Sequence, residues 1–175
     1  MTQDWQQYLL GEQVRLWPYS AGLYPPETLR QLWTVLNTTH FSHRLFWPNI
    51  GDQETITYGE FVEKMQRVIL LLPEDLTTHQ LMGCIWFDEI LEGIRAHWNI
   101  FYAKPFRGEK AREASRLSLA YGHDVMGWKT LWGITPWRDA QRHGIQCGFE
   151  QLCIIPGYAY VQGKYLDVYV GRHTA

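Results

Sequence analysis

Hydrophobic residues early in the chain repeat with the period of amphipathic helices. Leu29, Leu32, Trp33 and Leu36 follow the i, i+3, i+4, i+7 spacing that places side chains on one helix face. The two prolines before them suit the start of a helix, because the first turn makes no use of a backbone N–H. We therefore predict a helix that begins at these prolines and ends at residues 37–39.

A second helix is predicted from residue 57 onward. Thr57 and Glu60 have the spacing of a capping box, in which each side chain accepts a hydrogen bond from a free backbone amide. Pro73 is expected to end this helix, because proline cannot continue the hydrogen-bond pattern. The expected buried stripe consists of Phe61, Val62, Met65, Val68, Ile69 and Leu72.

From residue 81 the pattern changes to strands. Residues 81–88 form a nearly continuous apolar run, which is typical of a strand buried on both faces. Residues 89–93 would turn the chain, and residues 95–103 would return as a second strand. A short strand is also predicted at residues 15–20, where Pro18 interrupts it.

Helices and strands alternate through the next part of the chain. A helix is predicted over about residues 110–122, after Gly108, and a strand over residues 128–134. Thr135 and the proline after it are favoured at a helix N-cap and first turn, so another helix should follow. That helix would end at Gly148, in the left-handed conformation, with the next phenylalanine closing a Schellman contact.

The chain is expected to finish in a hairpin. Residues 154–157 lead into it, and its last strand, residues 165–170, alternates apolar and polar side chains. The element order is then β-α-α-β-β-α-β-α-β-β. This order predicts a single α/β (α+β) domain over residues 1–175, with a mixed central sheet and helices on both faces.

Composition and charge exclude several classes of protein. The chain is 15% aromatic with a net charge of −2, whereas disorder requires few aromatic residues and a high net charge. The same charge provides no basic field for nucleic acid or an anionic membrane. No stretch approaches the roughly 20 apolar residues of a membrane span, and the first residues do not resemble a signal peptide. We expect a cytoplasmic protein with no nucleic-acid or membrane partner.

Cysteine and histidine spacing gives no sign of a metal site. Cys84, Cys147 and Cys153 have no C-x-x-C spacing, and we expect them to be buried, reduced thiols. His40 and His43 lie three residues apart, but no further ligand completes a set. The sequence therefore predicts no bound metal.

Two segments carry a pattern that is known from one superfamily. The first is KPFRGEKAREA, residues 104–114, between a predicted strand and a predicted helix. The second is GITPWRDA, residues 133–140, followed by CGF at residues 147–149. In this order the segments resemble the GNAT superfamily of N-acetyltransferases over about residues 80–170. They are also similar to the GNAT-like proteins of tailed phages.

The resemblance implies a coenzyme A site with acetyl-CoA as co-substrate. In the family, backbone amides at a glycine-rich helix N-terminus bind the pyrophosphate, for which such amides are well suited. Two adjacent strands separate there and receive the pantetheine arm; here they would be residues 95–103 and 128–134. The implied cofactor-binding residues are Tyr102, Ala103, Lys104, Phe106, Arg107, Gly108, Lys110, Ala111 and Asp139.

Two positions depart from the family pattern. The loop before Ala111 is one residue short, and Glu109 stands where the family has its second glycine. A carboxylate at that point would repel the pyrophosphate unless its side chain points away. Gly144 stands where many members have a tyrosine that protonates the leaving thiolate.

Glu89 and His97 are the candidate general bases. A general base must reach the acceptor amine directly or through one water. Glu89 would lie at the end of one central strand, and His97 on the next. Each has a structural alternative: an acidic residue in a turn is commonly only solvated, and a histidine on an aromatic-rich strand is commonly packed and hydrogen-bonded.

The predicted function is an acyl-CoA-dependent N-acetyltransferase that acts on an amine acceptor. The alternative is a catalytically inactive GNAT-fold protein with a binding or structural role, as a homo-oligomer or as part of a phage virion. The aromatic residues expected to pack in the core are Trp86, Phe87, Trp98, Phe101, Trp128 and Trp132. Those expected to contact an acceptor or a protein partner are Phe41, Phe46, Trp47 and Trp137.

Overall fold

The computed structural model describes residues 9–19, 26–38, 57–161 and 163–175. Within these residues, seven strands form one mixed sheet in the order β1-β2-β3-β4-β5-β7-β6. All neighbouring strands are antiparallel except β4 and β5, which are parallel. The strands are β1 (Val14–Pro18), β2 (Ile69–Asp75), β3 (Gly83–Leu91), β4 (Arg95–Tyr102), β5 (Thr130–Thr135), β6 (Glu150–Val161) and β7 (Lys164–Thr174).

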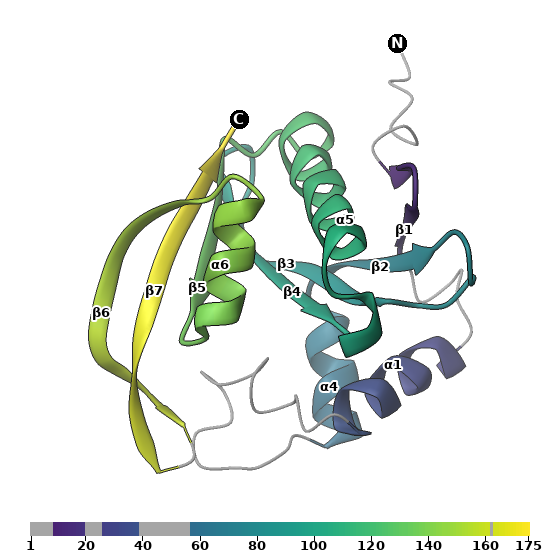
Figure 1. Ribbon diagram of the computed structural model, residues 1–175, viewed down its shortest axis with the longest axis horizontal. Helices are drawn as coiled ribbons and strands as arrows, with labels where there is room; N and C mark the ends of the chain where they lie inside the picture. Colours follow the sequence, from purple (N-terminus) through teal and green to yellow (C-terminus); the bar gives the residue numbers. More distant parts are fainter. Residues whose placement is uncertain (1–8, 20–25, 39–56, 162) are drawn as a thin grey trace.

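Helices cover both faces of the sheet (Figure 1). On one face, α5 contributes Ala111 and Ala114 to a core that contains Phe87 of β3. On the other face, α1 and α4 contribute to a second core, which contains Trp86 of the same strand. The predicted fold class, a mixed α/β sheet with helices on both faces, is confirmed. The α-helices are α1 (Pro26–Thr38), α4 (Tyr58–Met65), α5 (Glu109–Ala120) and α6 (Arg138–Gln146).

The second predicted helix is too long, and a strand follows it. The capping box is present, since the Glu60 amide donates to the Thr57 hydroxyl and the Thr57 amide to the Glu60 carboxylate. However, α4 ends at Met65, and residues 69–75 form β2. A short run of apolar residues fits the buried face of a helix as well as it fits a strand that is buried on both faces. Residues 69–75 pair with β1 on one side and with β3 on the other, so they form a strand, and Pro73 lies within it.

The end of α6 follows the prediction closely. Gly148 has a φ of 101°, its amide donates to the Ile145 carbonyl, and the Phe149 amide donates to the Gly144 carbonyl. These two bonds are the Schellman motif. The helix starts later than predicted, because Trp137 is its N-cap and Thr135 instead accepts a hydrogen bond from the Trp137 amide.

Most of the aromatic residues predicted for the core are buried there. Trp132 is the exception, since it is only half-buried. Among the cysteines, Cys84 and Cys147 are buried free thiols, but Cys153 is exposed, contrary to the expectation. Its strand, β6, lies at the sheet edge and has solvent on its outer side. The fully or largely buried members of the aromatic set are Trp86, Phe87, Trp98, Phe101 and Trp128.

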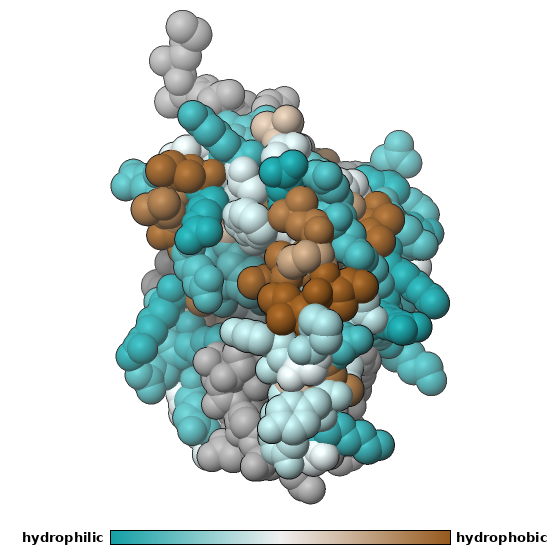
Figure 2. All heavy atoms as spheres, turned by 90° about the vertical axis from the view of Figure 1, so that its left-hand side faces the viewer, coloured by the Kyte–Doolittle hydropathy of each residue, from teal (hydrophilic) through white to brown (hydrophobic). Residues whose placement is uncertain are grey.

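Strand β6 forms one edge of the sheet and exposes apolar side chains. Leu152, Ile154 and Ile155 are each more than a third exposed. Figure 2 views the molecule from this side and shows hydrophobic side chains gathered on the surface. No helix in the described part of the chain is long and apolar enough to cross a membrane.

Candidate coenzyme A and acceptor site

Strands β4 and β5 separate after a short paired segment. Their parallel pairing covers only the three positions at which residues 95–97 face residues 130–132. Beyond His97 and Trp132 the two strands have no ladder between them, although each remains paired on its other side with β3 or β7. The backbone groups that face this gap are therefore available to a ligand.

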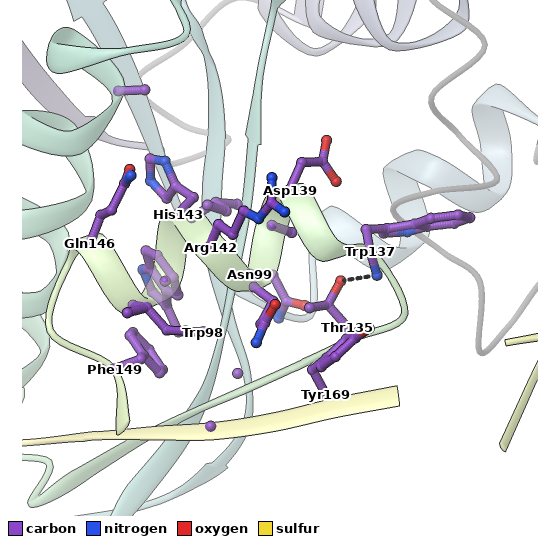
Figure 3. A pocket seen from close by; sticks show the side chains of 18 of the residues that line it. Trp98, Asn99, Thr135, Trp137, Asp139, Arg142, His143, Gln146, Phe149 and Tyr169 are labelled. Atoms are coloured by element: carbon purple, nitrogen blue, oxygen red, sulfur yellow. Dashed lines mark hydrogen bonds between the residues drawn. The ribbon is translucent and has the colours of Figure 1, made fainter. Parts of the chain in front are cut away.

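A cavity of about 410 Å³ occupies the gap (Figure 3). Trp86 and Phe101, from the core below α1 and α4, line it together with Trp98 and Tyr102, from the core below α5. The cavity is thus lined from both faces of the sheet. Its size lies within the usual range of small-molecule sites, about 300–1,000 Å³.

The N-terminus of α5 forms one wall of the cavity. Arg107, Gly108, Ala111 and Arg112 line it. Gly108 is the N-cap of α5 and has a φ of 113°, a backbone conformation that L-residues rarely adopt. Apart from the adjoining backbone, no atom lies within 4 Å of the position that a Cβ on Gly108 would occupy, so the start of α5 is open on this side. Free amides at a helix N-terminus in an open space suit an anion.

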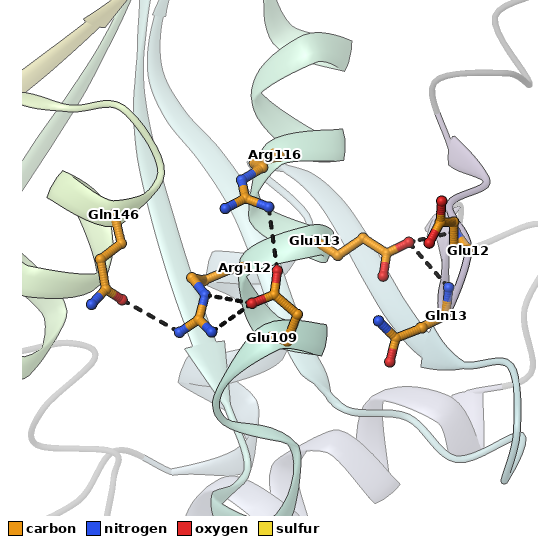
Figure 4. A network of polar contacts seen from close by, with 7 residues as sticks. All are labelled: Glu12, Gln13, Glu109, Arg112, Glu113, Arg116 and Gln146. Atoms are coloured by element: carbon orange, nitrogen blue, oxygen red, sulfur yellow. Dashed lines mark hydrogen bonds and ion pairs between the residues drawn. The ribbon is translucent and has the colours of Figure 1, made fainter.

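Glu109 turns its carboxylate away from the helix N-terminus. Its oxygens accept from Arg112 Nη2 at 2.6 Å and from Arg116 Nη1 at 3.4 Å, both further along α5 (Figure 4). The hydrogen bond from Arg112 lowers the pKa of Glu109. The carboxylate is therefore paired on the outer surface of α5, which removes the main electrostatic objection to an anion at Gly108.

Five of the nine predicted cofactor-binding residues line the cavity, and four do not. Lys110 lies outside it, because its Nζ donates to the buried Asp75 carboxylate at 2.7 Å. Phe106 packs against both hydrophobic cores, Ala103 is buried and Lys104 is exposed. The five that line the cavity are Tyr102, Arg107, Gly108, Ala111 and Asp139.

A chain of three hydrogen-bonded side chains connects β4, α5 and α6 on one side of the cavity. Tyr102 Oη lies 2.8 Å from Ser115 Oγ, which lies 2.8 Å from His143 Nε2. Burial, with the nearby Arg112 and Arg116 charges, lowers the pKa of His143 to about 4. His143 is therefore neutral at physiological pH. No motif in the sequence marks it, since its partners are 28 and 41 positions away along the chain.

The wall formed by α6 and β7 contains a tyrosine that the sequence did not single out. Tyr169 lines the cavity and accepts a hydrogen bond from Arg138 Nε at 2.9 Å. Gly144, in contrast, is buried on α6, where a Cβ would lie 3.8 Å from Phe149. A larger side chain at this position would therefore be in van der Waals contact with Phe149.

A polar cluster lies where β4 and β5 begin to separate. Asp88 Oδ1 lies 2.9 Å from His97 Nδ1 and accepts from Asn99 Nδ2 at 3.1 Å, while Oδ2 accepts from Trp86 Nε1 at 3.1 Å. Burial raises the pKa of Asp88, but the hydrogen bond and charge of His97 and the other donors outweigh it, so the net pKa is lowered. Within the described residues, His97 Nε2 is buried and has no hydrogen-bond partner.

Glu89, the other candidate base, lies outside the cavity lining. Its side chain is exposed, and its φ of 47° accompanies a β-bulge between Asp88 and Leu91. Strand β3 therefore continues to Leu91, whereas a turn was predicted over residues 89–93. The bulge explains why an exposed acid follows directly after the buried part of the strand.

Several residues singled out in the sequence lie outside the described part of the chain. These are His40, Phe41, His43, Phe46 and Trp47. Trp137, the remaining residue of the predicted contact set, does line the cavity. Among the described residues, no group of three or more histidine, cysteine or acidic side chains could hold a metal ion.

Comparison with known proteins shows a likeness at the level of structure. No family model and no curated protein matches the sequence. A spermidine N-acetyltransferase from Vibrio cholerae, solved in complex with CoA and spermine, matches with a TM-score of 0.75 and 18% identity, over 94% of this chain and 96% of that one.

Two other solved structures give the same picture. A ribosomal-protein-S5-alanine acetyltransferase from Vibrio fischeri matches with a TM-score of 0.66 and 12% identity, over 94% of both chains. A GNAT-family acetyltransferase from Bacillus anthracis matches with a TM-score of 0.71 and 12% identity, over 95% of this chain and 97% of that one. At these identities the likeness establishes the fold, which is that of the GNAT acetyltransferases.

Proposed function

We propose that the protein is an N-acetyltransferase that passes an acetyl group from acetyl-CoA to an amine. The observation that carries the proposal is the cavity between β4 and β5, which is lined from both faces of the sheet and has a helix N-terminus in its wall. Such a cavity lets a donor on one face meet an acceptor on the other. Fold alone would not support a function, because function depends on the site.

The side of the cavity at α5 is the proposed donor side. The backbone amides that follow Gly108 would bind the pyrophosphate, with Arg107 supplying positive charge near them. The unpaired edges of β4 and β5 would hydrogen-bond the pantetheine arm. When bound, the thioester supplies an activated acetyl group, and the residues that line the gap hold it in place.

The other side, below α1 and α4, is the proposed acceptor side. Trp86 and Asn99 line the cavity there. The spermidine and ribosomal-protein-S5-alanine acetyltransferases of the same fold make polyamines and alanine-containing peptides the first acceptors to test.

Calorimetry with acetyl-CoA and a thiol-release assay over a panel of amines test the proposal. We expect acetyl-CoA to bind with a micromolar dissociation constant and one class of amine to release CoA. If the folded protein binds no acetyl-CoA at millimolar concentration, the proposed function is wrong.

The second candidate function is a GNAT-fold binding or structural protein without activity, for instance in a phage particle. Two observations favour it: α6 has a glycine at position 144, where the resemblance would place a tyrosine, and β6 exposes apolar side chains along a sheet edge. Size-exclusion chromatography with light scattering, run beside the thiol-release assay, separates the two functions. Stable assembly without turnover would support the binding role.

A further inference from the structure

We propose that His97 is the general base of the acetyl transfer and that Asp88 is its positioning residue. The assignment rests on the proposed function, and it identifies the proton acceptor on the acceptor side of the cavity. Four observations support it: the hydrogen bonds around Asp88, the unpaired nitrogen of His97, the position of the pair in the sheet, and the poor placement of other candidates.

The hydrogen bonds to Asp88 fix the tautomer of His97. Trp86 Nε1 can only donate, and it lies 3.1 Å from one Asp88 oxygen, while the other accepts from Asn99 Nδ2. Asp88 thus acts as an acceptor toward its neighbours. His97 Nδ1, 2.9 Å from the same carboxylate, must therefore carry a proton. In the neutral imidazole the lone pair is then on Nε2.

The Nε2 atom of His97 is left without a partner. It is buried and has no hydrogen bond from the described part of the chain. A buried, unpaired acceptor is unfavourable and uncommon in native proteins. An acceptor amine, or a water held by it, would supply the missing donor. The His97 side chain is 16% exposed and that of Asp88 is 23% exposed, although the Nε2 atom itself is buried.

The pair lies next to the cavity, which His97 and Asp88 reach through two neighbours that line it, although they do not line it themselves. His97 is the last residue of β4 that pairs with β5, so the gap opens directly after it. Asn99, two residues further on the same face of β4, lines the cavity and hydrogen-bonds Asp88. Trp86, the cross-strand partner of Asn99, also lines the cavity and hydrogen-bonds Asp88. The cluster is therefore continuous with the cavity wall.

The alternative bases are less well placed. Glu89 is exposed, and in the described part of the chain it has no hydrogen bond to a residue that lines the cavity. His143 lines it from the α5 side, but its Nε2 is already bonded to Ser115, and its lowered pKa makes it a weak base. Lys64 on α4 interacts electrostatically with Asp88, and burial lowers the pKa of Lys64 itself.

Acetyl transfer to an amine releases one proton from the amine nitrogen, and the proposal gives this proton an acceptor. The amine nitrogen attacks the carbonyl carbon of the thioester, a C–N bond forms and the C–S bond breaks. The proton that leaves the amine goes to His97 Nε2, and Asp88 stabilises the resulting imidazolium. The sulfur departs as thiolate and takes up a proton from water. General-base assistance of this kind contributes about 10²–10⁴-fold to the rate.

Imidazole ¹⁵N NMR of the wild-type protein tests the tautomer without reference to activity. At neutral pH we expect His97 to carry its proton on Nδ1, and Asp88→Asn to remove that preference. A proton on Nε2 in the wild-type protein would overturn the assignment. This measurement remains decisive even if a His97 variant fails to fold.

Steady-state kinetics test the base itself. We expect His97→Gln to lower kcat by 10²-fold or more, to leave the KM for acetyl-CoA unchanged, and to abolish the acidic limb of the kcat/KM pH profile. His79→Asn is the matched control, because His79 Nδ1 lies 2.9 Å from Glu74 in a similar pair away from the cavity. It should retain wild-type kinetics.

The two proposals fail in different ways. Wild-type kcat and pH profile in His97→Gln would overturn the assignment of the base and leave the acetyltransferase proposal intact. A folded wild-type protein that binds no acetyl-CoA would overturn both. Loss of acetyl-CoA binding in His97→Gln, with kcat at saturation unchanged, would contradict a role on the acceptor side.

Discussion

His143 lies between α5 and α6, and its burial makes the stability of the protein depend on pH. Its pKa is lowered to about 4 in the folded chain, against an ordinary value of 6.5. Between these values the unfolded chain binds more protons at this site than the folded chain. The free energy of unfolding must therefore fall as the pH falls through this window, by about 2 kcal/mol at pH 5.

Urea denaturation of the wild-type protein and of His143→Gln, at pH 7.5 and pH 5, measures the effect. The variant retains a donor for Ser115 but has no titrating group, so it should lose about 2 kcal/mol less than the wild type between the two pH values. Equal losses in both proteins would show that His143 titrates normally.

Lys110 is expected to act in stability and not in donor binding. Its ammonium group pairs with Asp75, whose side chain is only 3% exposed and whose pKa is lowered chiefly by this hydrogen bond. Lys110→Met should reduce the free energy of unfolding by about 1–3 kcal/mol, because a buried carboxylate loses its charged hydrogen-bond partner. Denaturant unfolding checks the stability, and calorimetry checks the affinity for CoA.

The double variant Asp75→Asn with Lys110→Met is the control for that prediction. Removing both charges should recover part of the lost stability. A tenfold loss of CoA affinity in Lys110→Met, with stability unchanged, would instead support the role that the sequence motif implied for this lysine.

The sequence predicted those cavity-lining residues that lie close together in the chain. Arg107, Gly108 and Ala111 belong to one segment, so the motif was enough to predict their place at a helix N-terminus. Lys110 belongs to the same segment, but its partner Asp75 is 35 positions away and is not visible in any local pattern. His143 was missed for the same reason, because only folding brings it to Ser115.

At the level of elements, the start of α5 depends on Gly108. An alanine at a φ of 113° would be strained, although space for its Cβ exists, so the loop must change conformation. The helix-start amides would then move. We expect Gly108→Ala to weaken acetyl-CoA binding by tenfold or more, as measured by calorimetry.

Gly127→Ala provides a matched control for the effect of backbone strain. Gly127 also has a positive φ, 72°, with nothing within 4 Å of an added Cβ, and it does not line the cavity. It should lose about 1 kcal/mol of stability and retain its affinity for acetyl-CoA. Equal affinities in both variants would show that the Gly108 conformation is not needed for binding.

The sequence wrongly predicted helix where β2 forms, and this error has a physical explanation that applies to other sequences. Leu70, Leu71 and Leu72 are all buried, because β2 lies inside the sheet and helices cover both of its faces. In such a strand, apolar residues no longer alternate with polar ones. The continuous apolar run then also contains the i, i+3 and i+4 spacings of a helix. The capping box at Thr57 correctly predicted where α4 begins but contained no information on its length.

At the level of the whole molecule, the order of the remaining elements and the mixed α/β class were predictable from periodicity, caps and turns. The separation of β4 and β5 was anticipated only through the family resemblance. Nothing in residues 98–102 or 133–135 excludes pairing by itself, since most of these residues are aromatic or β-branched. Their divergence is a property of the assembled sheet.

Hydrogen exchange should detect this divergence. Amides of β4 and β5 that face the gap have no cross-strand acceptor, so they should exchange faster than amides of the same strands that bond to β3 or β7. Acetyl-CoA should slow them selectively. Uniform protection along both strands without ligand, as measured by NMR, would contradict the open gap.

The short β4–β5 segment also means that two sub-sheets, β1-β2-β3-β4 and β5-β7-β6, are joined by only three paired positions. A donor that bonds to both edges would act as an additional strand between them. Donor binding and the association of the two sub-sheets would then be thermodynamically coupled, so that each stabilises the other by the same free energy. Substitutions that loosen the junction far from the donor should weaken donor binding without removing a single contact to it.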